Sequence, residues 1–198
     1  MALEFWFDFA STYSYPTAMR IEAQAAAAGV ALTWKPFLLG PLFQSQGWTD
    51  SPFNIYPAKG RYMWRDLERL CSELDIPLRH PTKFPRNGVI ASRIASSCEG
   101  EPWIPDFIRA VYRANFAEDR DIADAELIAD CLEALGQPGR TLIERSQLPE
   151  QKDKLRRQTE EAQARGIFGA PTFMVGDEMF WGNDRLEAAI AWGRRKTE

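Results

Sequence analysis

The strand-like patterns of this chain lie at its two ends, and helical patterns fill the long stretch between them. At the N-terminal end, the apolar residues Leu3, Phe5, Phe7 and Phe9 alternate with Glu4, Trp6 and Asp8, and a period of two in an aromatic run predicts a strand. An alanine-rich helical segment follows at 17–28, and the alternation returns at 30–34 and stops before Pro36. Strand, helix and strand in this order form a βαβ unit if the two strands are parallel.

The C-terminal end predicts a hairpin and a last helix. Two short apolar runs, 172–175 and 178–181, flank a Gly-Asp pair that is typical of a tight turn. Asn183 or Asp184 is then expected to cap the final helix. The two ends together predict one small mixed sheet, with the helices of the middle inserted between its halves.

The middle of the chain is predicted to be helical, after one irregular segment. Apolar residues recur at helical spacing over 63–74, 90–98, 107–112 and 127–132. Prolines and glycines interrupt residues 38–58, and a loop of this length is uncommon unless it has a function. We expect its aromatic residues Phe43, Trp48 and Phe53 to line a hydrophobic pocket.

The composition excludes several classes of function. A chain of 198 residues forms one domain, or one domain with an insertion. Its net charge of −4 argues against general binding of nucleic acid or of membrane surfaces. The single histidine, His80, excludes a multi-histidine site, and we expect no bound metal. No segment is typical of a signal peptide or of a membrane span, so we expect a cytoplasmic protein.

The cysteines argue for packing rather than catalysis. Cys71, Cys98 and Cys131 form no C-x-x-C pair, which excludes a zinc knuckle and a dithiol redox motif. Their sparse, odd number fits a reducing cytosol, and each lies on the apolar face of a predicted helix. Hydrolysis through His80 and nucleotide binding have no supporting motif.

The junction between the first strand and the first helix is a candidate site. In an open α/β sheet, ligands bind beyond the carboxyl ends of the strands. A helix N-terminus there offers unpaired N–H groups and a partial positive charge, which would stabilise a thiolate. Ser11 and Ser14 lie in this turn, and either of them can instead be an ordinary helix cap.

Two features near the C-terminal hairpin are further candidates. Pro171 stands at the entrance of a predicted strand, either as a plain edge-strand proline or as a cis-proline that turns the N–H and C=O of Ala170 toward a ligand. The segment 181–184 precedes the final helix. Its Asn183 and Asp184 are either caps or a site where an acid holds a ligand ammonium and backbone amides hold a carboxylate.

The resemblance to a known family rests on three stretches in combination: FDFASTYSY at 7–15, PAKGRYMWRDLERL at 57–70 and GIFGAPTFMVGDEMFWGNDRLE at 166–187. With S-x-x-S in place of C-x-x-C and a helical insertion, the chain resembles the DsbA-like branch of the thioredoxin fold. More narrowly, and over essentially its full length, it resembles the 2-hydroxychromene-2-carboxylate isomerase family, relatives of the kappa-class glutathione transferases. The resemblance implies an α/β thioredoxin-like fold, with a discontinuous domain at 1–40 and 165–198 and a linker loop plus inserted helical domain at 41–164.

The resemblance also implies roles for individual residues. The hydroxyl of Ser11, as the catalytic residue, would contact the sulfur of glutathione and lower its pKa. The residues that it implies around glutathione are Ser11, Lys59, Ala170, Pro171, Trp181, Gly182, Asn183 and Asp184. The residues that it implies around the organic substrate are Asn54, Lys59 and Phe84.

The implied function is a glutathione-dependent cis–trans isomerisation of a small unsaturated aromatic acid, performed by a homodimer that does not consume glutathione. A kappa-like glutathione transferase or peroxidase, which consumes glutathione, is the alternative among enzymes. A non-catalytic thioredoxin-fold binding domain is the third alternative, and the retained Lys59 and segment 181–184 count against it. Ser11 and Ser14 stand where redox cysteines would, which disfavours a DsbA-like oxidase.

Overall fold

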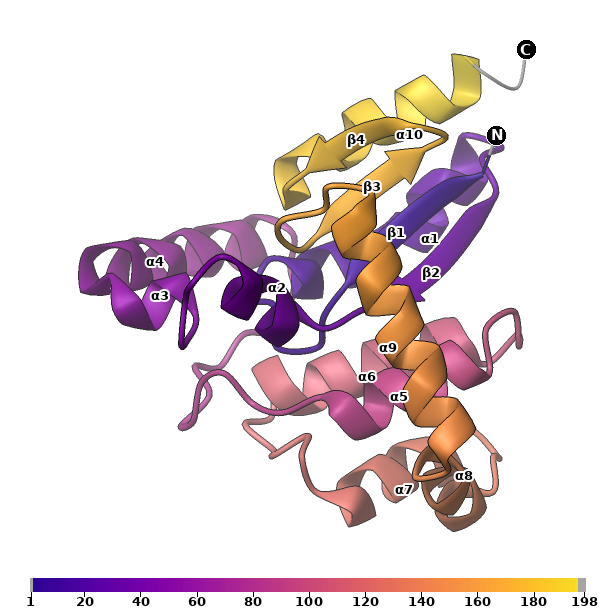
Figure 1. The fold of residues 1–198 in the computed structure, drawn as a ribbon. Coiled ribbons are helices and arrows are strands. Elements are labelled where there is room, and N and C mark those ends of the chain that lie inside the picture. Colours follow the sequence, from indigo (N-terminus) through magenta and orange to yellow (C-terminus); the bar gives the residue numbers. More distant parts are fainter. Residues whose placement is uncertain (1, 196–198) are drawn as a thin grey trace.

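The computed structural model describes residues 2–195 and folds them around a four-stranded mixed sheet (Figure 1). Its strands are β1 (Leu3–Phe7), β2 (Leu32–Pro36), β3 (Thr172–Val175) and β4 (Glu178–Trp181), in the spatial order β2–β1–β3–β4. β1 is parallel to β2 and antiparallel to β3, and β3 and β4 form the hairpin. The prediction that the two ends of the chain share one sheet is therefore confirmed.

β1 is a central strand that is buried on both of its faces. Phe5 lies opposite Trp34 of β2 and Phe173 of β3, and its ring centroid is 5.3 Å and 5.8 Å from theirs. Trp6 points to the other face of the sheet, where it packs with Met174. Two buried faces explain why aromatic residues occupy adjacent as well as alternate positions of this strand.

Helices cover both faces of the sheet. α1 (Ser14–Ala27) and α10 (Leu186–Arg195) pack on the face that carries Phe5, whereas α9 (Pro149–Ala164) crosses the face that carries Trp6 (Figure 1). α1 connects β1 to the parallel strand β2, so these three elements are the predicted βαβ unit.

The chain between β2 and α9 is helical. Its helices are α2 (Leu39–Ser45), α3 (Pro52–Ile55), α4 (Pro57–Glu73), α5 (Val89–Ser97), α6 (Ile104–Phe116), α7 (Ala125–Glu133) and α8 (Gly139–Ser146). In Figure 1, α5 to α8 gather beyond one end of the sheet, and α4 extends away from them beside α3. α6 links this group to α1, because the rings of Tyr112 and Phe116 lie 6.1 Å and 5.5 Å from that of Tyr15.

Some boundaries differ from the sequence expectation. β1 ends at Phe7, because the following residue, Asp8, accepts hydrogen bonds from the backbone and turns the chain. β2 includes Pro36, which is tolerated because β2 is an edge strand. The irregular segment 38–58 contains α2 and α3, and Pro57 begins α4, a position where a proline loses no hydrogen bond.

The prediction that Asn183 or Asp184 caps the last helix is wrong. A turn of 3₁₀ helix, η1 (Asn183–Arg185), separates β4 from α10, and no side chain of the described residues caps the start of η1. Gly182 precedes it with a φ of 111°, a conformation that favours glycine. The buried Asn183 instead accepts a hydrogen bond from Thr17 Oγ1 at 2.9 Å, which ties η1 to α1. Over residues 2–195, no helix is long and apolar enough to cross a membrane.

Candidate active site

The turn between β1 and α1 places Ser11 at the start of a helix. The Ser11 N–H donates to the Asp8 carbonyl at 2.9 Å, and the Ala10 N–H donates to the Asp8 carboxylate at 2.8 Å. The Ser11 hydroxyl oxygen accepts a hydrogen bond from the Ser14 N–H, the first residue of α1, at 3.3 Å. The helix N-terminus and the hydroxyl therefore lie together, as the sequence predicts.

The same hydroxyl also reaches across the sheet to the second candidate segment. Ser11 Oγ donates to the Ala170 carbonyl oxygen at 3.0 Å. The bond between Ala170 and Pro171 is cis, which confirms that prediction. Because Ser11 both accepts from Ser14 and donates to Ala170, its role at the helix start is compatible with a role toward a ligand.

A large cavity opens beside Ser11 and Ala170. Its volume is about 750 Å³, within the range of small-molecule sites. Its lining includes Trp181, residues 168–170 and 84–89, and most of residues 38–53. Ser11 lies in the lining and is only 7% exposed, so a ligand in the cavity can reach the hydroxyl while bulk water has little access to it.

The aromatic residues of the 38–58 segment line this cavity, as expected. The half-buried Phe43 and Trp48 pack together with ring centroids 5.6 Å apart. Phe53 lies in the lining near Tyr13, with ring centroids 6.5 Å apart. Gly60 of α4 makes room for Phe53, because a Cβ at this glycine would collide with the Phe53 carbonyl oxygen. The segment is therefore an apolar wall for a planar ligand.

The structure separates the residues predicted around the organic substrate. Phe84 lines the cavity and packs on Trp64 with ring centroids 5.1 Å apart. Asn54 does not line it. The Asn54 amide instead donates to Asp50 Oδ2 at 3.1 Å and to the Phe84 carbonyl at 3.3 Å, so it joins α3 to the segment that contains Phe84.

Lys59 brings a positive charge to the cavity. Its Nζ lies 4.8 Å from the ring centroid of Tyr56, and its side chain lines the cavity. Arg86, another cation of the lining, is paired with Asp119, whereas Lys59 has no carboxylate partner among the described residues. Lys59 is therefore the lining cation that is available to an anionic ligand.

The segment 181–184 is only partly at the cavity. Trp181 is 53% exposed and packs on Phe168 at the rim, with ring centroids 4.8 Å apart. Its indole covers Gly169, where a Cβ would lie 2.5 Å from the indole nitrogen. Gly182, Asn183 and Asp184 do not line the cavity, and the Asn183 side chain faces α1.

Asp8, which the sequence did not single out as a site residue, is buried in the cavity wall. Its carboxylate accepts hydrogen bonds from the Leu39 N–H at 2.7 Å and the Ala10 N–H at 2.8 Å. Burial raises the pKa of this carboxyl, and the two N–H groups oppose that rise. Asp8 thus holds the Ser11 turn and the start of α2 together. An acid inside the aromatic run FWFDF was the signal that could have revealed it.

The described residues offer this cavity neither a thiol nor a metal site. Burial raises the pKa of Cys71 to about 11 and also raises the pKa of Cys98 and of Cys131. None of these three cysteines lines the cavity. Over residues 2–195, no group of histidine, cysteine and acidic side chains is arranged to hold a metal ion. A thiol that reacts here has to arrive with a ligand.

The chain is similar to known proteins over most of its length. The chain is 28% identical to a 2-hydroxychromene-2-carboxylate isomerase of Sphingobium xenophagum, over 93% of this chain and 94% of that protein. It is 25% identical to human glutathione S-transferase kappa 1, over 93% and 87% of the two chains. A solved 2-hydroxychromene-2-carboxylate isomerase superimposes with a TM-score of 0.88 and 26% identity, over 100% of this chain and 98% of that one.

The family model of the DSBA-like thioredoxin domain matches residues 2–189, which include both halves of the sheet and all the helices between them. The chain therefore belongs to the family of DSBA-like thioredoxin domains.

Proposed function

We propose that this protein is a glutathione-dependent isomerase of a small unsaturated aromatic acid of the 2-hydroxychromene-2-carboxylate type. The contact of Ser11 Oγ with the Ala170 carbonyl, at the start of α1 and in the wall of an aromatic cavity, carries the proposal. The relatives named as isomerases support it, since they match the chain almost from end to end.

The residues present fit a bound peptide thiol. The Ala170 carbonyl faces the cavity, so a peptide N–H can replace the Ser11 hydroxyl as its donor. The hydroxyl is then free to donate to a thiolate, and such a bond to a charged group is worth about 1.5–3 kcal/mol. The N-terminus of α1 adds roughly 0.3–1 kcal/mol for an anion. Both contributions favour the ionised sulfur.

Ser11 and Ala170 would hold glutathione, which when bound would supply a thiolate nucleophile for reversible addition to a conjugated carbon and so allow the double bond to isomerise. Lys59 binds the carboxylate of the substrate or the negative charge that develops on it. Phe43, Trp48 and Phe53 hold the aromatic part and exclude water from it. The thiol is regenerated in each cycle, so glutathione acts as a cofactor.

A kappa-like glutathione transferase or peroxidase is the second candidate. The identity to human glutathione S-transferase kappa 1 favours it, and the same Ser11 site would serve it. The two candidates differ in the fate of the thiol, because a transferase or a peroxidase consumes glutathione.

The experiment that tests the proposal follows the ultraviolet spectrum of 2-hydroxychromene-2-carboxylate together with a titration of free thiol. The isomerase predicts many turnovers for each glutathione and no loss of thiol. Stoichiometric loss of thiol would favour the second candidate. If glutathione raises the melting temperature of the protein but the spectrum of the substrate stays constant, the protein is better described as a non-catalytic binding domain.

We further propose a cytoplasmic homodimer, as the family resemblance implies. The free thiols of Cys71, Cys98 and Cys131 suit a compartment that keeps glutathione reduced. Analytical ultracentrifugation of the purified protein tests the dimer, and a single species with the monomer mass of 22.6 kDa would contradict it.

A further inference from the structure

The two backbone carbonyls just before Ala10 are held by side chains from the helical insertion. Tyr112 Oη donates to the Asp8 carbonyl at 2.9 Å, and Asn115 Nδ2 donates to the Phe9 carbonyl at 3.1 Å. Both donors come from α6 and are three residues apart, so they lie on one face of that helix.

Both donors are fully in the protein interior. Tyr112 is 0% and Asn115 is 1% exposed. Burial, with a further contribution from the nearby Asp8 carboxylate, raises the pKa of Tyr112, so its phenol stays protonated and remains a donor. Water cannot replace either donor, so the Phe9 carbonyl depends on Asn115 for its hydrogen bond. The Asp8 carbonyl accepts one hydrogen bond from the Ser11 N–H and a second from Tyr112.

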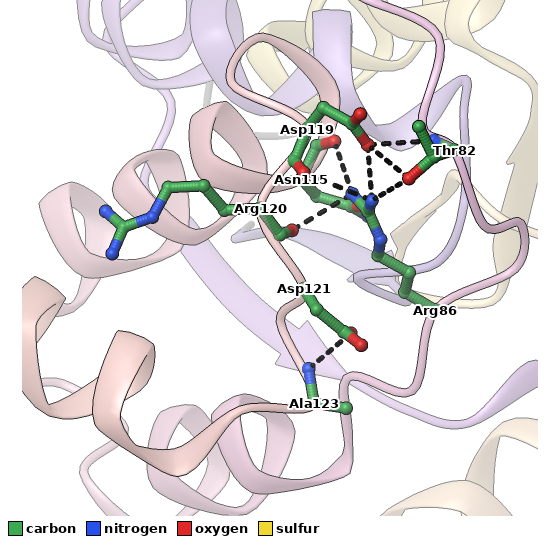
Figure 2. Close-up of polar contacts among 7 residues, drawn as sticks. All are labelled: Thr82, Arg86, Asn115, Asp119, Arg120, Asp121 and Ala123. Atoms are coloured by element: carbon green, nitrogen blue, oxygen red, sulfur yellow. Dashed lines mark hydrogen bonds and ion pairs between the residues drawn. The ribbon is translucent and has the colours of Figure 1, made fainter.

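The orientation of the Asn115 amide is set by Arg86. Figure 2 shows the Arg86 guanidinium enclosed by oxygen atoms of Thr82, Asn115, Asp119 and Arg120. Arg86 Nη1 donates to Asn115 Oδ1 at 3.3 Å, and Nη2 is paired with the Asp119 carboxylate. A guanidinium has donors only, so the amide oxygen has to face it and the amide nitrogen has to face Phe9.

Arg86 also belongs to the wall of the cavity. It lies in the lining together with Phe84 and Gly88. Gly88 packs directly on Phe9, since a Cβ at Gly88 would lie 2.7 Å from the Phe9 Cβ. The wall on the substrate side therefore touches the Ser11 turn both through this contact and through Arg86 and Asn115.

We propose that Tyr112 and Asn115 are positioning residues for Ser11, and that Arg86 fixes Asn115 in the orientation that this task requires. The inference rests on the proposed function for what Ser11 does. A hydroxyl that stabilises a thiolate has to be held within a fraction of an ångström, and supports that lock the preceding backbone provide that. The α6 helix of the insertion thus takes part in the chemistry of the sheet domain.

Tyr112→Phe and Asn115→Asp test the proposal with little change of shape. The first removes the phenolic donor and keeps the ring. The second keeps an oxygen for Arg86 and places an acceptor where the Phe9 carbonyl needs a donor. Tyr62→Phe is the matched control for the first, because Tyr62 lies on α4 and is 63% exposed.

Arg86→Lys tests the orientation of Asn115. A lysine keeps the charge beside Asp119, but one ammonium cannot replace the fork that joins Asp119 to Asn115. Arg120→Lys is its control, because the Arg120 side chain points away from the cluster and pairs with Asp130 at 3.3 Å (Figure 2). All variants are compared at equal fractions folded, as measured by urea unfolding.

We expect faster hydrogen exchange of the Ala10 and Ser11 N–H groups in Tyr112→Phe and Asn115→Asp, and normal exchange in both controls. The pKa of the bound glutathione thiol should rise by about one unit, and kcat should fall by roughly tenfold, the size of one misdirected hydrogen bond. KM for glutathione should change by less than about twofold, because its contacts near Ala170 remain. Arg86→Lys should shift the same quantities in the same direction.

Unchanged exchange in folded Tyr112→Phe and Asn115→Asp would overturn the inference, as would altered exchange with an unchanged thiol pKa. If Asn115→Asp does not fold, Tyr112→Phe decides the question alone. A wild-type protein that does not isomerise the substrate would refute the proposed function, whereas the exchange data, which need no ligand, would still decide the positioning role.

Discussion

Removal of the Ser11 hydroxyl should shift the pH at which the protein becomes active. The hydroxyl now donates to Ala170 O at 3.0 Å and is 7% exposed, so a bound thiolate would accept its hydrogen bond with little competition from water. A hydrogen bond to a charged group of about 1.5–3 kcal/mol corresponds to roughly 1–2 units in the thiol pKa. In Ser11→Ala the pKa of the bound thiol should therefore rise by about that amount.

The consequence for activity has a definite sign. The thiolate is the reactive form, so activity is present above the thiol pKa and is lost as the pH falls through it. At pH near 7 the variant should lose roughly three- to fifteenfold in kcat/KM, because the higher basicity of its thiolate offsets part of the smaller ionised fraction. The loss should shrink as the pH rises above the thiol pKa of the variant.

The assay records the thiolate absorbance of bound glutathione and the rate of isomerisation over the same pH series. Ser92→Ala is the matched control, since Ser92 is buried in α5 and lies outside the cavity lining. The free energy of unfolding should fall by only about 1 kcal/mol in Ser11→Ala. Identical pH profiles in wild type and Ser11→Ala would refute the reasoning, because the helix N-terminus alone would then account for the thiolate.

Further predictions follow from the same neighbourhood. In Ser11→Cys the thiol at the start of α1 should have a pKa below about 8.5 and form a mixed disulfide with oxidised glutathione, releasing one reduced glutathione, as measured by intact mass and by thiol release. Gly88→Ala should lower the free energy of unfolding by about 1–3 kcal/mol, because the new Cβ would lie 2.7 Å from the Phe9 Cβ, whereas Gly40→Ala, with open space around it, should not. The Thr82 N–H and the Arg86 guanidinium hold the pKa of Asp119 below its ordinary value of 3.8. The stability that the Asp119 carboxylate contributes is therefore present above pH 3.8 and is lost as the pH falls from there through the lower pKa of the folded protein. Urea unfolding of Asp119→Asn between about pH 3 and 6 should show a flatter dependence on pH than wild type, and parallel curves would contradict this.

The sheet and its connectivity could be predicted because their signals are local. The alternation at 3–9 and the Gly-Asp pair before Glu178 mark strands and a turn through sterics and burial that act over a few residues. Neither signal depends on knowing what lies across the fold. The edge position of β2 does depend on it, which is why Pro36 was expected to end the strand and instead belongs to it.

Of the candidate site, only the contact between Ser11 and Ala170 could be predicted from the sequence. Ser11 and Ala170 were found because a helix start and a proline at a strand entrance are visible in sequence. The roles of Asn54 and Asn183 were not visible, because an asparagine side chain can serve a ligand or the protein itself. The structure shows both bound to protein groups, Asn54 to the Phe84 carbonyl and Asn183 to α1.

The contacts of Asp8, Asn115 and Arg86 could not have been found by spacing, although an acid inside the run FWFDF does mark Asp8 itself. Each acts through contacts with residues far away in the chain, such as Leu39 for Asp8 and Phe9 for Asn115. Such contacts exist only once the insertion has packed against the sheet, and a pattern of a few residues carries no information about them.

The segment that walls the cavity is held by its backbone and its ends rather than by its aromatic rings. Its start is fixed where Asp8 accepts from the Leu39 N–H, and its end where Asn54 donates to the Phe84 carbonyl. Phe43 and Trp48, in contrast, pack mainly on each other and are only half-buried. Replacing them costs less folding free energy than a change in the core would. The aromatic lining can in this way change, and with it the compounds that fit the cavity, while the Ser11 turn and the two ends of the segment stay in place.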